Sequence, residues 1–197
     1  MKTVILGVAL AALCSVPAFA GLKVGDTAPD FTAKASLGGK EFTFKLNEAL
    51  KKGPAVVYFY PSAYTGGCDL EAHTFAENHE KFEAAGASII GVSADNLERL
   101  NQFAADPAFC AGKFPIASDE SLKIAKSYNL KTTEAKAGAK DVRGVEIGHG
   151  FIERVTFVVG KDHKIMAVMS SKQDKLSPDQ HVEKSLEMVQ KMKMASK

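Results

Sequence analysis

The chain has 197 residues, of which 46% are hydrophobic and 24% are charged, so it is long enough to bury the core of a single domain. Its 25 basic and 23 acidic residues give a formal net charge of +2. A balance this close to neutral gives no electrostatic reason to expect binding to nucleic acid or to a membrane surface. We therefore expect neither nucleic acid nor a stable membrane association among its partners.

The first twenty residues have the pattern of an export signal. Lys2 gives a positive start, Val4 to Val16 is a nearly continuous apolar run, and Ala18-Phe19-Ala20 is a cleavage pattern. The apolar run is shorter than the roughly 18 residues that a bilayer-spanning helix needs. We predict a signal peptide over residues 1–20, one domain over residues 21–197, and an exported protein in the periplasm or another extracytoplasmic compartment.

Turn residues and the spacing of apolar side chains predict alternating strands and helices along the rest of the chain. In order, the first elements are a hairpin at 31–33 and 41–45, a buried strand at 55–60, a helix from 68 to about 86, and a strand at 88–93. A helix from 95, a strand at 114–117, a helix from 118 or 119 to about 128, a hairpin at 154–159 and 164–168, and a last helix from 178 follow. Strands separated by helices predict a central sheet that helices cover on both faces. The closing hairpin and helix are typical of an α/β, thioredoxin-like fold with a mixed sheet.

Individual residues refine two of these helices and one loop. Asp95 is a candidate N-cap for the helix that follows it. Ser177, Pro178 and Gln180 form a capping box with proline at the position where a helix tolerates it. The stretch from Lys131 to Gly150 has no regular pattern, and a loop this long inside a compact domain is usually functional or mobile.

Cys68 follows a buried strand and a loop, and it lies in the first turn of an expected helix. Unpaired backbone N–H groups and the helix dipole favour an anion at that position. Helix N-termini and nearby cations lower the pKa of a thiol, and the thiolate is the nucleophilic form. The position therefore predicts an activated cysteine with a lowered pKa. The alternative is a buried, inert cysteine.

The residues around Cys68 are similar to a known pattern. Pro61-Ser-Ala-Tyr-Thr65-Gly-Gly-Cys68 reads as P-x-x-x-T-x-x-C, which resembles the active-site motif of peroxiredoxins. Tyr58-Phe-Tyr-Pro61, Glu71 and the strand that opens with Arg154 are also similar to that family. The resemblance covers most of residues 21–191, and the most similar subgroup is the Q-type, or bacterioferritin-comigratory, peroxiredoxins.

This resemblance implies a thioredoxin-dependent type of peroxidase that acts on hydrogen peroxide and organic hydroperoxides with no cofactor. It implies that Cys68 attacks the O–O bond and becomes a sulfenic acid. Thr65 would interact with the thiolate and the peroxide through its hydroxyl, and Pro61 would shield the sulfur from water. Arg154 would keep the thiolate charged and stabilise the negative charge that develops on the leaving oxygen.

Supporting roles and simpler interpretations stand beside these assignments. The resemblance implies that Glu71 orients either the arginine or Tyr60. Taken alone, Thr65 could be a helix cap or loop hydroxyl, Pro61 a strand end, and Arg154 a member of a surface ion pair.

Cys110 is the candidate resolving cysteine. A sulfenic acid must be resolved before it is over-oxidised, and cleavage of the leader would remove Cys14. In some Q-type members the resolving cysteine lies in this general region, whereas others place it five residues after the peroxidatic one, where this chain has His73. We expect the Cα atoms of Cys68 and Cys110 to be more than about 7 Å apart in the reduced fold, so that the helix must unwind locally. A structural disulfide, an uninvolved Cys110 with an external thiol, and a disulfide between chains remain open.

Other functions lack a residue that they require. The five histidines do not pair with cysteine or carboxylate at ligand spacing, so no metal site is expected. A thiol–disulfide oxidoreductase usually needs C-x-x-C, and Thr65 stands at the position of the first cysteine. A non-catalytic thioredoxin-like binding module is the alternative from a different class. The expected partners are a peroxide substrate and a thioredoxin-like or other thiol reductant, and the expected state is a monomer or weak homodimer.

Overall fold

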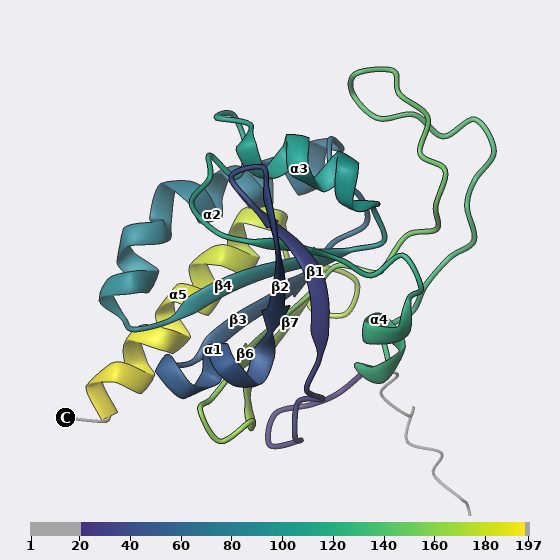
Figure 1. Ribbon diagram of the computed structural model, residues 1–197. Helices are drawn as coiled ribbons and strands as arrows, with labels where there is room; N and C mark the ends of the chain where they lie inside the picture. Colours follow the sequence, from purple (N-terminus) through teal and green to yellow (C-terminus); the bar gives the residue numbers. More distant parts are fainter. Residues whose placement is uncertain (1–20, 196–197) are drawn as a thin grey trace, which may run out of the picture.

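The computed structural model describes residues 21–195, and the predicted signal peptide over residues 1–20 lies outside them. Seven strands form one sheet in the order β2-β1-β5-β4-β3-β6-β7 (Figure 1). The strands are β1 (Thr32–Leu37), β2 (Lys40–Lys45), β3 (Ala55–Phe59), β4 (Ser88–Ser93), β5 (Ile116–Ser118), β6 (Val155–Val159) and β7 (Ile165–Ser170). The helices are α1 (Leu46–Lys52), α2 (Gly66–Ala84), α3 (Leu97–Ala105), α4 (Lys123–Ser127) and α5 (Pro178–Ala195).

The sheet is mixed, as the sequence predicts. Strand β4 runs parallel to both β3 and β5, whereas β6 runs antiparallel to both β3 and β7. Both predicted hairpins form, since β1 also pairs with β2 in antiparallel register. Every residue of β3 and β6 is buried, as expected for strands that are covered on both faces.

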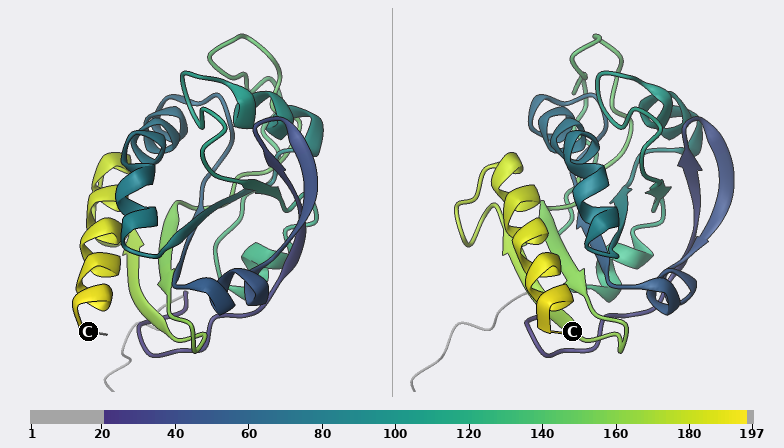
Figure 2. Two further views of the ribbon diagram at one scale, coloured as in Figure 1. Left: turned by 60° about the vertical axis from the view of Figure 1, so that its left-hand side comes forward. Right: turned by 90° about the vertical axis from the view of Figure 1, so that its left-hand side faces the viewer.

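Alternate residues of β3 point into two separate apolar cores. Val57 and Phe59 pack with α1 and α4, whereas Val56 and Tyr58 pack with α2, α3 and α5. Helices α2 and α5 lie side by side on one face of the sheet (Figure 2). The predicted thioredoxin-like sheet with helices on both faces is therefore confirmed.

Two helices differ from the prediction. Helix α1 was not predicted, because it has only seven residues, buries only Leu46 and Leu50, and begins without a side-chain cap. Helix α4 begins at Lys123 rather than at Ser118 or Asp119. The Asp119 carboxylate nevertheless accepts hydrogen bonds from the amides of Ile124 and Ala125 at 3.1 and 2.8 Å, so the predicted cap acts across a non-helical turn.

The predicted cap of α3 is wrong by one residue. Asn96, not Asp95, is the N-cap, and its side chain accepts a hydrogen bond from the Arg99 amide at 2.9 Å. Asp95 is fully buried and turns toward the loop before Cys68 instead.

Replacing Asn96 by Ala should lower the free energy of unfolding by about 1 kcal/mol, because one amide of the first helical turn then loses its acceptor. Urea denaturation of the variant and the parent protein measures this difference. An unchanged midpoint would show that water replaces the cap at no cost.

Helix α5 begins with one half of the predicted capping box. The Ser177 amide donates to Oε1 of Gln180 at 3.0 Å, and Pro178 is the first helical residue. His181 is fully buried on this helix, which the sequence analysis did not predict. Within residues 21–195 no helix combines the length and the apolar character needed to cross a membrane.

Candidate active site

Cys68 is the third residue of α2, and only 2% of its surface is exposed. Its amide donates to the Thr65 carbonyl at 2.7 Å, which closes the first turn of the helix. Gly67 precedes it, and a Cβ atom at Gly67 would lie 3.3 Å from Nη2 of Arg154. The glycine therefore leaves room for the arginine to approach the helix N-terminus.

Arg154 lies directly before β6, 86 residues further along the chain than Cys68. The register of β3 and β6 pairs Phe59 with Val155, so Arg154 lies beside the end of β3 from which the chain runs toward Cys68. Its Nη2 atom donates to Sγ of Cys68 at 3.1 Å, and its Nη1 atom pairs with Oε2 of Glu71. The arginine side chain is 10% exposed, so this pairing takes place largely out of water.

The other predicted site residues lie around this pair. The Thr65 hydroxyl donates to the Ser62 carbonyl at 2.8 Å and also interacts with the Cys68 sulfur. Pro61 is half-buried, two residues after the end of β3. Tyr60 is buried with its ring stacked on Tyr58, the centroids 5.4 Å apart. Of the two partners considered for Glu71, the structure shows a contact with the arginine.

Burial raises the pKa of the Cys68 thiol above its ordinary value. The Arg154 guanidinium and the Thr65 hydroxyl lower this pKa, but they do not outweigh the loss of hydration. The lowered pKa that the sequence analysis predicts for Cys68 is therefore wrong for this buried site. The arginine still favours the thiolate over the thiol, because an adjacent cation stabilises the charged form.

Glu71 and His181 are two fully buried titratable residues next to Arg154. Burial raises the pKa of Glu71 to about 7, although Arg154 opposes the shift. Among the described residues, Oε1 of Glu71 has no hydrogen-bond partner, and it lies 3.9 Å from Nδ1 of His181. The hydrogen bonds of the His181 ring are with Thr156 at 2.9 Å and with Ser171 at 3.0 Å. Burial and the nearby Arg154 lower the pKa of His181 to about 4, so it is neutral at physiological pH.

The sequence analysis set His181 aside with the other histidines. The available signal was its spacing of four residues from Ser185, because two polar residues then share a turn of α5 next to its apolar face. Both side chains are buried in the structure, and the Ser185 hydroxyl donates to the His181 carbonyl at 2.6 Å.

Cys110 is a free, fully buried thiol in the segment between α3 and β5. Burial raises its pKa well above the ordinary value. Cys68 and Cys110 belong to one apolar cluster, which also contains Tyr58 and Tyr60. No disulfide joins the two cysteines in the structure. The predicted separation and the predicted helix unwinding stay predictions.

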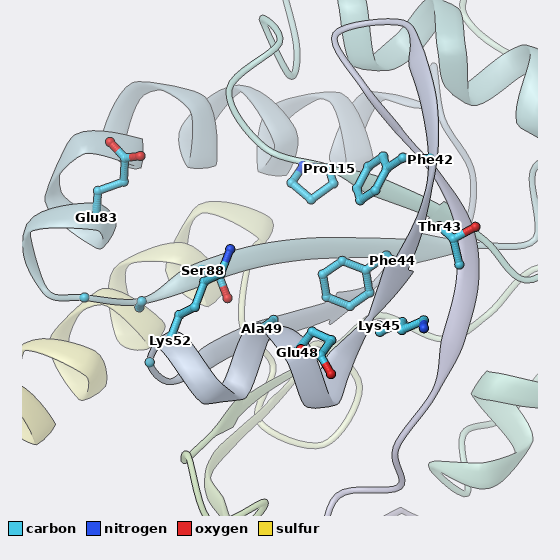
Figure 3. Close-up of a pocket in the computed structure, with 13 residues that line it drawn as sticks. Phe42, Thr43, Phe44, Lys45, Glu48, Ala49, Lys52, Glu83, Ser88 and Pro115 are labelled. Atoms are coloured by element: carbon cyan, nitrogen blue, oxygen red, sulfur yellow. The ribbon is translucent and has the colours of Figure 1, made fainter.

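A separate cavity of about 560 Å³ lies between β2, α1 and the turn after α2 (Figure 3). Phe42, Phe44 and Pro115 give it an apolar wall, and its lining residues do not include Cys68, Thr65 or Arg154. In the part of the chain that the structure describes, no three His, Cys, Asp or Glu side chains gather as a potential metal site. Cys68 and its neighbours therefore remain the candidate active site.

Known proteins share this combination of fold and site. The model of the AhpC/TSA family matches residues 24–168. The chain is 31% identical over 175 residues to a chloroplastic peroxiredoxin Q of Sedum lineare, which covers 89% of this chain and 82% of that protein. The solved structure of peroxidoxin BcpB from Mycobacterium tuberculosis superposes with a TM-score of 0.68 at 29% identity, over 85% of this chain and 96% of that one. A peroxiredoxin Q structure from Xanthomonas campestris gives a TM-score of 0.62 at 26% identity, over 81% of this chain and 90% of that one.

A thioredoxin-like sheet that holds a cysteine at a helix N-terminus against an arginine defines a thiol-dependent redox enzyme. This chain belongs to the AhpC/TSA family. Its relatives include Q-type peroxiredoxins, and it is a thiol-dependent peroxidase with a peroxide substrate and a thioredoxin-type reductant.

Proposed function

We propose that Cys68 is the peroxidatic cysteine of this enzyme. The thiolate sulfur attacks one oxygen of the peroxide, the O–O bond breaks, and the second oxygen leaves with the bonding electron pair. The products are a sulfenic acid on Cys68 and, after uptake of a proton, water or an alcohol. The sulfur is oxidised by two electrons and the peroxide is reduced by two.

The contact between Arg154 and Cys68 carries this proposal. A guanidinium group 3.1 Å from Sγ stabilises the thiolate before the reaction. The same group stabilises negative charge on the leaving oxygen during bond breakage, in a site where water does not screen the interaction. Glu71 holds the arginine by its other nitrogen, so the guanidinium plane is fixed before substrate arrives. Thr65 supplies a hydroxyl beside the sulfur, and the role that we propose for Pro61 is to shield the sulfur from water.

We further propose that Cys110 resolves the sulfenic acid. Attack by the Cys110 thiolate on the Cys68 sulfur releases water and forms a disulfide, which a thioredoxin-type dithiol then reduces. The proposal is supported by the place of both thiols in one apolar cluster. Both thiols are buried, and we expect the first turn of α2 to open before the two sulfur atoms meet.

We also propose that the protein is exported and works outside the cytoplasm, which rests on the leader pattern in residues 1–20. The reductant then has to be a dithiol protein of that compartment. The oligomeric state that we propose is a monomer or weak homodimer.

Stopped-flow oxidation of the reduced mature protein tests these roles in the parent, Cys68→Ser and Cys110→Ser proteins. We expect fast loss of hydrogen peroxide only when Cys68 is present, and loss of both thiols in the parent. Cys110→Ser should stop at a sulfenic acid or proceed to over-oxidation. If all three proteins react at the rate of a free thiol, Cys68 is not peroxidatic. If a thioredoxin-type dithiol reduces the oxidised Cys110→Ser protein as readily as the oxidised parent, Cys110 is not the resolving cysteine.

A further inference from the structure

Residues 131–150, which we call the strap, form a long loop without helix or strand between α4 and β6 (Figure 1). A backbone bridge between Thr132 and Ile152 joins the two ends of this loop, and a second bridge between Lys140 and Glu146 narrows its middle. A polar cavity of about 600 Å³ separates much of the strap from α3. Within the strap Ile147 is buried, whereas Val142 and Val145 are exposed. Apolar packing therefore holds the strap mainly at Ile147, and polar contacts hold the rest.

Those contacts converge on the turn that leads to Cys68. The Ala63 amide donates to Oδ2 of Asp95 at 2.8 Å, and the Ala63 carbonyl accepts from Nη2 of Arg99 at 2.8 Å. Asp95 is fully buried, and the Arg99 side chain is 11% exposed. Both backbone polar groups of one residue in the active-site turn are thus held by buried charged side chains.

Asp95 and Arg99 pair with each other, with Oδ1 and Nε 2.8 Å apart, and the strap adds one further partner to each. Oδ2 of Asp141 lies 2.8 Å from Nη2 of Arg99, and Nε2 of His149 lies 2.8 Å from Oδ1 of Asp95. Asp141 is fixed within the strap, because its Oδ1 atom accepts hydrogen bonds from the amides of Arg143 and Val145 at 2.8 and 3.0 Å. Removal of Asp141 would leave Arg99 without its partner in the strap.

Tyr64 is one of the points where the strap contacts the turn directly, in addition to the 3.4 Å contact between Oγ of Ser62 and Nε2 of His149. The Tyr64 φ angle of 58° is in the left-handed region, which is costly for a residue other than glycine. The Val142 amide donates to the Tyr64 carbonyl at 2.9 Å, and the Arg143 guanidinium lies 3.3 Å from the centre of the Tyr64 ring. A strained residue of this kind persists only where its surroundings hold it.

We propose that the strap is a positioning element of the active site, and that Asp141 and Arg143 are the positioning residues through which it holds the turn before Cys68. Two hydrogen bonds connect the turn to the helix turn that carries the Cys68 sulfur. The Thr65 hydroxyl donates a hydrogen bond to the Ser62 carbonyl, and the Cys68 amide donates one to the Thr65 carbonyl. A displaced turn therefore moves the start of α2, and with it Sγ, away from Arg154. The inference rests on the proposed role of Cys68.

The test compares Asp141→Asn and Arg143→Ala with Lys136→Ala, a matched control at an exposed position of the same strap. The second-order rate with hydrogen peroxide is measured by stopped flow, and the Cys68 pKa by the pH dependence of iodoacetamide alkylation in a Cys110→Ser background. Misplacement of a reacting group by about 1 Å costs roughly a hundredfold in rate. We expect the two strap variants to react roughly tenfold to a hundredfold more slowly, with a raised Cys68 pKa, and the control to react at the parent rate.

Thermal unfolding of the same proteins separates positioning from stability. If Asp141→Asn and Arg143→Ala only lower the melting temperature and keep the parent rate and Cys68 pKa, the inference is overturned. Arg143→Ala keeps the test decisive if Asp141→Asn does not fold, because the arginine side chain is already 33% exposed. A parent protein that does not react through Cys68 would contradict the proposed function instead, which is a different result.

Discussion

Replacing Arg154 by Ala should raise the pKa of the Cys68 thiol further and slow its reaction with hydrogen peroxide by roughly a hundredfold to a thousandfold. Burial already raises this pKa, and the guanidinium is the foremost group that opposes the shift. Without Arg154 less thiolate is present at neutral pH, and the leaving oxygen loses its donor. The thiolate fraction is measured by ultraviolet absorbance against pH in a Cys110→Ser background, and the rate by stopped flow.

Arg154→Lys is the matched control for charge. It keeps a cation near Sγ, but a single nitrogen replaces the two guanidinium nitrogens that donate separately to Glu71 and Cys68. We expect its thiol pKa to lie nearer the parent value than that of Arg154→Ala, and its rate to lie between the two. An Arg154→Ala protein that reacts as fast as the parent would remove the arginine from the mechanism.

Single replacements of Glu71 and His181 should change the pH dependence of stability in opposite directions. The folded pKa of Glu71, about 7, is above its ordinary 4.5, so the folded protein binds the extra proton and unfolding becomes easier as pH rises through this range. The folded pKa of His181, about 4, is below its ordinary 6.5, so the unfolded chain binds the extra proton and stability rises with pH. Between about pH 4.5 and 6.5 the two contributions offset each other in the parent.

Each variant therefore reveals the contribution of the residue that remains. Relative to the parent, Glu71→Gln should gain stability as pH rises from about 4.5 to 6.5, and His181→Asn should lose stability over the same range. Each slope amounts to about 1.4 kcal/mol per pH unit at most. Urea denaturation at several pH values measures them, with Glu77→Gln as the control at an exposed position of α2. Parallel curves for all four proteins would mean that neither buried group titrates as described.

The strands and the core of the site were predictable because their signals are local. Apolar runs mark β3 and β6, and the spacing of Thr65 and Cys68 after Pro61 carries the family resemblance in eight consecutive residues. Arg154 was found only through that resemblance, because the register of β3 and β6 that brings it to Cys68 is a tertiary property.

The features that were missed depend on long-range contacts. The direction of the Cys68 pKa depends on how completely α2 and the neighbouring loop exclude water, which no sequence pattern specifies. The place of His181 in the site depends on its proximity to Glu71, which is 110 residues earlier in the chain. In the sequence the strap is recognisable only as an irregular stretch. Its conformation depends on the ion pair of Asp141 with Arg99 and on the packing of the Arg143 guanidinium over the Tyr64 ring.

The most direct test of the account is the location of the first oxidation product. Reduced Cys110→Ser protein is treated with one equivalent of hydrogen peroxide in the presence of dimedone, and the adduct is located by peptide mass spectrometry. We predict a single dimedone adduct on Cys68, in an amount that accounts for the peroxide lost, and no adduct in a protein that also carries Cys68→Ser. Fast peroxide loss without an adduct on Cys68, or the same loss in the protein that lacks both thiols, would contradict the assignment of Cys68 as the nucleophile.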